Sequence, residues 1–438
     1  MSESLAERIE RGGHDGYAYA YPHKTAYRTL DPPVPLQEAW SEEDRSSLFL
    51  YVHLPFCEMR CGFCNLFTTV QPAADFVSAT LDATRRQSEV VAGSVQPESI
   101  SRAAFGGGTP SLLSTSQLQT LFDRLAATWP VDWADVPVSF ETSPGTVDAE
   151  KCQALRSLGV DRLSIGVQSF VESELSALGR PPRSEEVRRA LTEIRQADFP
   201  VLNIDLIYGM NGQTEGSWHQ SLERALEWEP EELYLYPLYV RELTGLGKKG
   251  RRPATNRRRL QVLARDLLES RGYEQVSLRL FRRSDVTVPE ADYCCQEDGM
   301  VGLGPGARSY TSTLHYSTEY AVGQAGVRRI ISDFVDRPSA AFGLADFGVR
   351  LEPSEQRRRY LIKSLLRTDG LDATYRERFG AEPESHFPEL AELTELGLCQ
   401  RDGDLLRLTR AGLELSDTIG PWLYSESVQR RMAACETS

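Results

Sequence analysis

The chain alternates between short apolar runs and longer amphipathic segments from residue 48 to about residue 248. The apolar runs are rich in β-branched and aromatic residues, which is typical of buried strands. We expect six strands, at residues 47–54, 101–108, 136–142, 162–168, 201–209 and 232–240. The intervening segments repeat apolar residues at helical spacing, at residues 75–92, 116–129, 148–159, 184–199 and 216–230. Strands that alternate with helices predict a parallel sheet with right-handed crossovers.

Six such units are fewer than the eight that close a (β/α)8 barrel. We therefore predict an α/β fold in which residues 48–248 form an open, partial (β/α)6 barrel. In folds of this kind the chemistry lies at the carboxyl ends of the parallel strands. Residues 1–47 are polar and rich in turn residues, so we expect an extended N-terminal arm that lies on the body of the protein.

The pattern changes after residue 248. A basic run at residues 248–260 is more typical of a solvated linker and helix start than of an anion site. Residues 259–283 predict a helix followed by a strand, and the last hundred residues predict helices around a hairpin that turns at residues 401–404. We interpret residues 249–438 as a C-terminal α+β capping domain with a winged-helix-like end.

Composition restricts the compartment and the partners. The 438 residues include only eight cysteines, so a disulfide scaffold is not expected. The chain has no apolar run long enough to span a membrane, and its first residues lack the apolar segment of a secretory signal. We therefore expect a cytoplasmic protein. Its net charge of −14 argues against a nucleic-acid or membrane partner.

Three of the eight cysteines lie within eight residues, in the spacing C-x3-C-x2-C. Cys57, Cys61 and Cys64 follow the first predicted strand directly. Three thiolates from one loop can hold three corners of an iron–sulfur cubane. A structural zinc ion would need a fourth ligand, and the nearby His53 lies inside the predicted strand, where a core position is the more common one. We predict a cluster that leaves one iron open to an exogenous ligand.

Five motifs in order carry a resemblance to a known family. They are "YVHLPFCEMRCGFCNLF", "FGGGTPSLL", "RLSIGVQSF", "ALGR" and "NIDLIYGMNGQT". They resemble the radical S-adenosylmethionine (SAM) superfamily, and within it the HemN-type group of oxygen-independent coproporphyrinogen III oxidases and their relatives. The resemblance runs from about residue 50 to 310. In detail the sequence is most similar to HemN-like enzymes of biosynthetic clusters.

The resemblance implies a cofactor and a reaction. Cys57, Cys61 and Cys64 would bind a [4Fe–4S] cluster, and SAM would chelate its open iron. Reductive cleavage of SAM would give a 5′-deoxyadenosyl radical that activates a C–H bond of a small-molecule substrate. A flavodoxin- or ferredoxin-type protein would donate the electron, and we expect the enzyme to be a monomer.

The same resemblance implies the residues that contact SAM. They stand at the ends of the predicted strands and are Gly107, Gly108, Thr109, Glu141, Gln168, Arg180 and Asp205. Asp205 interrupts an apolar run, and a lone buried acid is costly, so we expect it to have a partner. Arg180 could bind the SAM carboxylate with its forked donors. Tyr51 matches a family tyrosine near the sulfonium and is our candidate catalytic residue, although an aromatic core position would explain it nearly as well.

A glycine-rich loop at residues 299–310 matches the segment that borders a second SAM in the oxidases. The matching residues are Gly302, Gly304, Gly306 and Ala307, followed by Arg308. Arg308 stands where the oxidases carry an apolar residue and the haem chaperones carry histidine. Cys294 and Cys295 lie just upstream, beside Gln296. They could be a buried structural pair or a hydrogen-atom donor, and the sequence leaves both readings open.

One difference from the oxidases determines the order of our functional hypotheses. Leu66 stands where the oxidases carry a fourth cysteine. Our first hypothesis is therefore a radical SAM transferase that uses a second SAM for methyl or methylene transfer to a small unsaturated metabolite. The alternatives are a coproporphyrinogen III oxidase and a haem chaperone of the same family. The sequence does not identify the substrate or show whether a second SAM binds.

Overall fold

The computed structural model describes residues 3–12, 16–286 and 299–435. Among these residues, one large sheet has the strand order β1-β15-β14-β13-β12-β2-β5-β6-β7-β8-β9-β11-β10. Its centre is a run of six parallel strands, which confirms the predicted α/β partial barrel. They are β2 (Leu48–Leu54), β5 (Ile100–Gly107), β6 (Val138–Thr142), β7 (Arg162–Gln168), β8 (Val201–Tyr208) and β9 (Glu232–Pro237).

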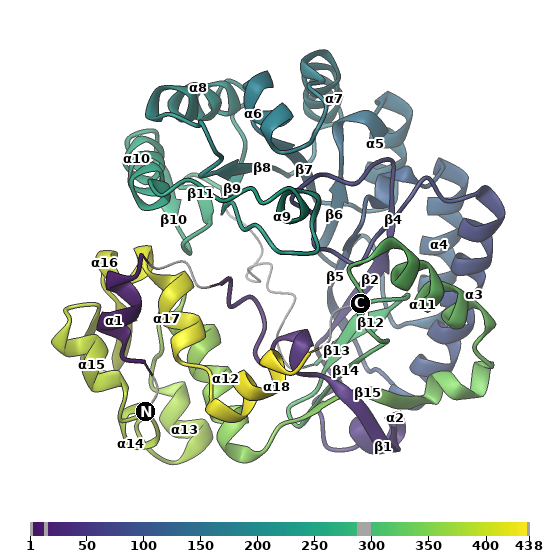
Figure 1. Cartoon of the computed structure of the whole chain (residues 1–438). Coiled ribbons are helices and arrows are strands. Elements are labelled where there is room, and N and C mark those ends of the chain that lie inside the picture. Colours follow the sequence, from purple (N-terminus) through teal and green to yellow (C-terminus); the bar gives the residue numbers. More distant parts are fainter. Residues whose placement is uncertain (1–2, 13–15, 287–298, 436–438) are drawn as a thin grey trace.

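Helices cover the outer side of these strands (Figure 1). They are α3 (Ala74–Val95), α4 (Thr115–Thr128), α5 (Ala149–Ser157), α6 (Glu172–Ala177), α7 (Ser184–Gln196) and α8 (Glu215–Leu226). In α4 the apolar residues Leu118, Leu121, Phe122 and Leu125 fall on one face and are buried in the main core. A Ser114–Gln117 capping box begins this helix. The predicted spacing of apolar residues therefore produces the observed layers.

The sheet is wider than the sequence pattern indicated. β12 (Met300–Leu303) adds a seventh parallel strand beside β2. Beyond it run four antiparallel strands, β13 (Arg308–Tyr310), β14 (Leu314–Ser317), β15 (Leu344–Arg350) and β1 (Arg28–Pro35). β11 (Leu280–Arg283) and β10 (Tyr273–Gln275) extend the other edge. The sequence analysis did not predict β1 or β12 to β15 as strands, because these short segments show little apolar alternation and lie in regions interpreted as an arm, a glycine-rich loop and helices.

A second core lies opposite the barrel helices. It joins the N-terminal arm to the C-terminal helices, with Leu5, Ala18 and Tyr21 packed among residues such as Leu361 and Ile419. The helices of this side are α1 (Leu5–Glu10), α12 (Pro353–Leu365), α13 (Thr374–Phe379), α14 (Pro383–His386), α17 (Ser416–Trp422) and α18 (Glu426–Ala433). Figure 1 shows the arm between the strand ends and these helices.

The hairpin expected at residues 401–404 is present. β16 (Cys399–Asp402) and β17 (Leu405–Leu408) pair antiparallel, between α15 (Leu390–Glu395) and α16 (Arg410–Glu414). Within the basic run, α10 (Arg257–Ser270) begins as predicted. The remaining elements are α2 (Leu36–Ala39), α9 (Gly245–Lys248), α11 (Gln324–Asp336), β3 (Phe56–Cys57), β4 (Thr69–Val70) and the 3₁₀ turns η1 (Lys24–Ala26), η2 (Pro110–Leu112), η3 (Pro144–Thr146) and η4 (Ser339–Gly343). No helix in the described ranges is both long and apolar enough to cross a membrane.

Candidate active site

A cavity of about 1370 Å³ opens at the carboxyl ends of the parallel strands. It is bounded by the strand ends, the N-terminal arm and the C-terminal helices. The structure brings most of the predicted site residues to its wall. These are Tyr51, Cys57, Cys61, Cys64, Gly107, Gly108, Thr109, Glu141, Gln168, Arg180, Asp205, Gly306 and Arg308.

The loop that carries the cysteines is clamped by backbone hydrogen bonds. The Gly62 N–H donates to the Leu178 carbonyl at 2.9 Å, and the Leu246 N–H donates to the Gly62 carbonyl at 2.7 Å. A Cβ at position 62 would come within 2.6 Å of the Leu178 oxygen, so only glycine permits this approach. The "ALGR" motif, which follows the end of α6, therefore supplies through Leu178 one of the two backbone hydrogen bonds that fix the cysteine loop.

The three thiols lie in a poorly solvated setting that contains hydrogen-bond donors. Burial raises the pKa of Cys57 to about 12 and also raises that of Cys64. The Thr109 hydroxyl lies 3.6 Å from the Cys57 sulfur, and Arg180 Nη1 lies 3.7 Å from the Cys61 sulfur. The buried Thr68 hydroxyl also lies beside the loop, and hydrogen bonding from it lowers the pKa of Cys57 and Cys64 against the larger effect of burial. Donors of this kind can stabilise sulfur that becomes negatively charged when it binds metal.

This donor set fits a cluster better than a single ion. Among the residues that the structure describes, no group of three histidines, cysteines or acids could hold one metal ion. A cubane does not require such a group, because each thiolate binds a different iron. Three thiols on one loop that faces one cavity, with hydroxyl and guanidinium donors beside them, therefore suit the [4Fe–4S] cluster predicted from the sequence.

The glycine turn after β5 allows close packing against the first strand. Gly107 has φ +99°, and a Cβ there would lie 2.3 Å from the His53 ring. A Cβ on Gly108 would lie 2.5 Å from the Phe56 carbonyl oxygen. The His53 ring contacts the Tyr51 hydroxyl and the Phe67 carbonyl, each at 3.2 Å, and burial lowers its pKa to about 4. His53 is therefore a neutral core residue, as its place in the strand predicted, and the turn packs directly over it.

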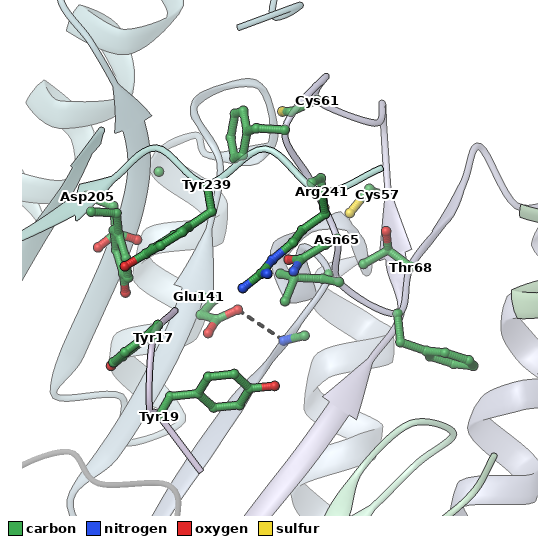
Figure 2. Close-up of a pocket in the computed structure, with 18 of the residues that line it drawn as sticks. Tyr17, Tyr19, Cys57, Cys61, Asn65, Thr68, Glu141, Asp205, Tyr239 and Arg241 are labelled. Atoms are coloured by element: carbon green, nitrogen blue, oxygen red, sulfur yellow. Dashed lines mark hydrogen bonds between the residues drawn. The ribbon is translucent and has the colours of Figure 1, made fainter. Parts of the chain in front are cut away.

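Two carboxyl groups share the floor of the cavity. Burial raises the pKa of Glu141 to about 7 and that of Asp205 to about 6. Glu141 accepts a hydrogen bond from the Gly107 N–H at 3.0 Å (Figure 2). Asp205 accepts from the Asn203 amide at 2.7 Å and from the Ser164 hydroxyl at 3.3 Å, so it has the partners that its apolar run required. Both carboxyls can accept hydrogen bonds from ligand hydroxyl or ammonium groups.

Arg180 is oriented by the barrel itself. Its Nη2 donates to the Gly166 carbonyl at 2.7 Å, while its Nη1 approaches the Cys61 thiol. Gln168, at the end of β7, has φ +73°, which is a strained conformation for a residue with a side chain. Contact between SAM and Gln168 or Arg180 remains a prediction, with the remaining guanidinium donors of Arg180 available for it.

The glycine-rich loop contributes only part of its predicted set to the cavity. Gly304 and Ala307 do not line it. A Cβ on Gly304 would lie 2.3 Å from the His53 carbonyl oxygen, so this glycine packs against β2, and Ala307 is buried. Arg308 does face the cavity and stacks over the Tyr19 ring at 5.1 Å. Cys294, Cys295 and Gln296 lie outside the described residues.

The sequence analysis missed the aromatic and cationic wall on the side of the cavity formed by the N-terminal arm. Tyr17 and Tyr19 come from the arm, and between them Ala18 is buried in the second core. Tyr234 and Tyr236 alternate in the same way along β9 and stack at 5.4 Å. The sequence did contain a signal for this wall, namely tyrosine at every second position in both segments. Further lining residues of this wall are His23, Lys24, Tyr239, Arg241, Tyr320 and Tyr424, some of which Figure 2 shows.

Comparison with known proteins gives two family matches in this chain. Residues 51–225 match the model of the radical SAM superfamily, and residues 351–415 match the HemN C-terminal domain. The first match covers the parallel strands and the cysteine loop. The second covers α12 to α16, on the far side of the cavity.

Individual relatives carry two different names. The chain is 30% identical to the heme chaperone HemW of Mycobacterium tuberculosis over 390 residues, 84% of this chain and 93% of the relative. It is 27% identical to the oxygen-independent coproporphyrinogen III oxidase of Synechocystis over 423 residues, 91% and 88% of the two chains. The solved structure of coproporphyrinogen III oxidase (HemN) from Escherichia coli shares the fold, with a TM-score of 0.75, 24% identity, and coverage of 92% of this chain and 96% of that one.

Proposed function

The chain belongs to the HemN-type group of the radical SAM superfamily, and from this premise we propose that it is a radical SAM oxidoreductase acting on a carboxylate-bearing substrate of the porphyrinogen kind. Cys57, Cys61 and Cys64 would hold a [4Fe–4S] cluster. One observation carries the proposal: the three thiols share one cavity with Thr109, Glu141 and the other predicted SAM contacts.

The cofactors, when bound, supply a strong one-electron reductant and a hydrogen-abstracting 5′-deoxyadenosyl group. The chain's own residues bind, orient and exclude water. Arg180 and Thr109 place donors beside two of the sulfurs. Glu141 and Asp205 provide buried acceptors for ligand hydroxyl and ammonium groups. The arm limits access of water to the cavity from the side of the second core.

The comparisons favour an oxidase or a chaperone over one-carbon transfer, because the relatives reported above bear the first two names only. One feature of the structure favours the oxidase. His23 and His53 are the described histidines that line the cavity. His23 contacts the Tyr19 and Thr25 hydroxyls at 3.0 and 2.9 Å, and His53 is held by its own two contacts. Neither imidazole is open to a haem iron.

An anaerobic assay tests the proposal. The cluster is reconstituted and reduced with dithionite, and SAM is added with and without coproporphyrinogen III. We expect 5′-deoxyadenosine and loss of carbon dioxide from the porphyrinogen, measured by mass spectrometry. S-Adenosylhomocysteine formation with an intact porphyrinogen would instead support one-carbon transfer. A fully loaded protein that makes no 5′-deoxyadenosine but binds haem would support the chaperone.

A further inference from the structure

Three cations from separate segments meet at the arm side of the cavity. Lys24 comes from the arm, Arg241 from the loop after β9, and Arg308 from the start of β13. All three line the cavity, and we refer to them as the arm-side cations. Figure 2 shows Arg241 directed from its loop into the pocket.

Aromatic rings hold these cations in place. The Lys24 ammonium lies 3.7 Å from the centre of the Tyr320 ring, and the Tyr320 hydroxyl donates to the Asn65 carbonyl at 2.9 Å. Asn65 follows Cys64 directly, so Lys24 is tied through one tyrosine to the cysteine loop. Arg308 stacks over Tyr19 at 5.1 Å. A ring face positions the Lys24 amine without consuming its N–H donors, so these remain available for a ligand oxygen.

Lys24 and Arg241 are the members of the group whose charge partners can be compared with the cavity acids. No ion pair joins Lys24 or Arg241 to an acid among the described residues. Two of the cavity acids lie close to other arginines, since Glu319 pairs with Arg329 at 2.8 Å and Glu58 lies 3.8 Å from Arg183. A third, Glu242, follows Arg241 in the chain and also lines the cavity. The surrounding field is positive: burial lowers the pKa of His23 and of His53, and the charges of Lys24 and Arg308 lower both further. Burial and the Arg308 charge also lower the pKa of Lys24 well below its usual value, so a bound carboxylate would favour the charged form of this amine. Like charges gathered in a poorly solvated cavity are unfavourable unless an anion joins them.

We propose that the arm-side cations are a binding site for a carboxylate of the substrate, with Lys24 as the residue that contacts it. The tyrosine wall formed by Tyr17, Tyr19, Tyr234 and Tyr236 suits the ring system that carries this carboxylate. The connection of Lys24 to the cysteine loop would bring the anchored side chain close to the reactive end of the cavity. The inference rests on the proposed function for the substrate's identity.

The first test measures ligand binding to the reconstituted protein. Coproporphyrin III carries four carboxylates and is fluorescent, and its tetramethyl ester carries no free carboxylate. We expect Lys24→Met to weaken coproporphyrin III binding about 10- to 100-fold, the effect of losing a charge-assisted hydrogen bond. Ester binding should not change. Lys24→Arg should recover most of the affinity, and Lys249→Met, outside the cavity, is the matched control.

SAM also carries a carboxylate, so SAM affinity is measured in the same variants. A loss of SAM affinity in Lys24→Met, with coproporphyrin III binding unchanged, would assign the site to the SAM carboxylate rather than to the substrate. Equal binding of every ligand by Lys24→Met and wild type would overturn the inference. The turnover assay of the proposed function is independent of this result.

A simple probe covers the case in which coproporphyrin III does not bind at all. Millimolar benzoate, a carboxylate on a ring, should raise the melting temperature of the wild-type protein and of Lys249→Met but not that of Lys24→Met. Removing one of several like charges should also leave the ligand-free Lys24→Met at least as stable as wild type. If benzoate stabilises all variants equally, or if Lys24→Met is markedly less stable without ligand, Lys24 is only a structural partner of Tyr320 and the site is refuted.

Discussion

The cysteine end of the cavity and its arm side differ in how far apart in the sequence their residues lie. The cysteine end takes its three thiols from residues 57–64 and its surroundings from the ends of neighbouring parallel strands. The arm side combines residues 17–24, 234–241 and 308–320 with Tyr424. A sequence motif identifies the cysteine end, because its three thiols are close together in the chain. It does not identify the arm side, because only folding brings those residues together.

The two regions also differ in what holds them. Backbone hydrogen bonds and glycines fix the cysteine loop, as at Gly62. Side chains fix the arm side through a buried ion pair between Arg279 and Asp417, with N–O distances of 2.6 and 2.7 Å. The Tyr239 hydroxyl donates to Asp417, and the Tyr17 ring lies 3.6 Å from the Arg279 guanidinium. α17 therefore positions two cavity tyrosines from the second core.

Loss of a thiol should produce the largest effect and should be confined to the cysteine end. We expect Cys61→Ala to lose the charge-transfer absorbance of the reconstituted cluster and to reduce 5′-deoxyadenosine formation below detection, because one cluster ligand is missing. Cys435→Ser, a free cysteine outside the cavity, is the control. Full iron content and activity in Cys61→Ala would contradict the cluster assignment.

Breaking the buried ion pair should be the largest perturbation of the arm side. Asp417→Ala leaves the Arg279 charge buried without its acid, and we expect a loss of about 3–5 kcal/mol in the free energy of unfolding. Denaturant unfolding of the apoprotein measures it. The exposed pair Arg329–Asp333 is the comparison, where Asp333→Ala should cost about 0–1 kcal/mol. Equal costs for the two variants would show that the arm side does not depend on this ion pair.

Substitution of Gly107 should show how much stability is lost when the glycine turn after β5 carries a side chain. Gly107→Ala combines an unfavourable φ with a Cβ 2.3 Å from His53, and we expect it to cost about 2–4 kcal/mol of stability. Gly212→Ala carries a similar φ of +85° but would meet nothing within 4 Å, so it should cost about 1–2 kcal/mol. If thermal unfolding finds no difference between the two, the close contact with His53 does not restrict this turn.

The smallest expected effect is a change in how the free energy of unfolding depends on pH, caused by Glu141 at the floor of the cavity. The pKa of Glu141 is raised by burial from 4.5 to about 7, so the folded state keeps a proton that the unfolded state loses. The apoprotein should therefore lose stability as the pH rises from about 4.5 to 7. Glu141→Gln removes this penalty and should regain about 1–3 kcal/mol at pH 8 relative to pH 5.

Chemical unfolding at several pH values checks this prediction, and Glu227→Gln, at the exposed position that follows α8, serves as its control. The same pH slope in wild type and Glu141→Gln would show that Glu141 does not carry the shift. Asp205, whose pKa is also raised, adds a contribution of the same sign at a lower pH and should persist in the Glu141 variant.

The sequence by itself determined the six parallel strands, their covering helices and the cysteine loop. These features depend on local periodicity and on residues that adjoin in the chain, so no knowledge of distant contacts was needed. It also identified Glu141 and Asp205 at strand ends, where parallel strands necessarily converge. Assignment to the HemN-type group followed from the same local motifs.

Only the tertiary structure decided which strands extend the sheet, which parts of the glycine-rich loop reach the cavity, and which residues line its arm side. Gly304 packs against β2 while Arg308, four residues later, faces the cavity, a difference that spacing cannot reveal. Lys24 and Arg241 are 217 positions apart and line the same cavity because the arm folds back over the strand ends. Such an arrangement depends on side-chain packing between segments that share no local pattern, which is why the cysteine motif could be recognised in the sequence and the arm side could not.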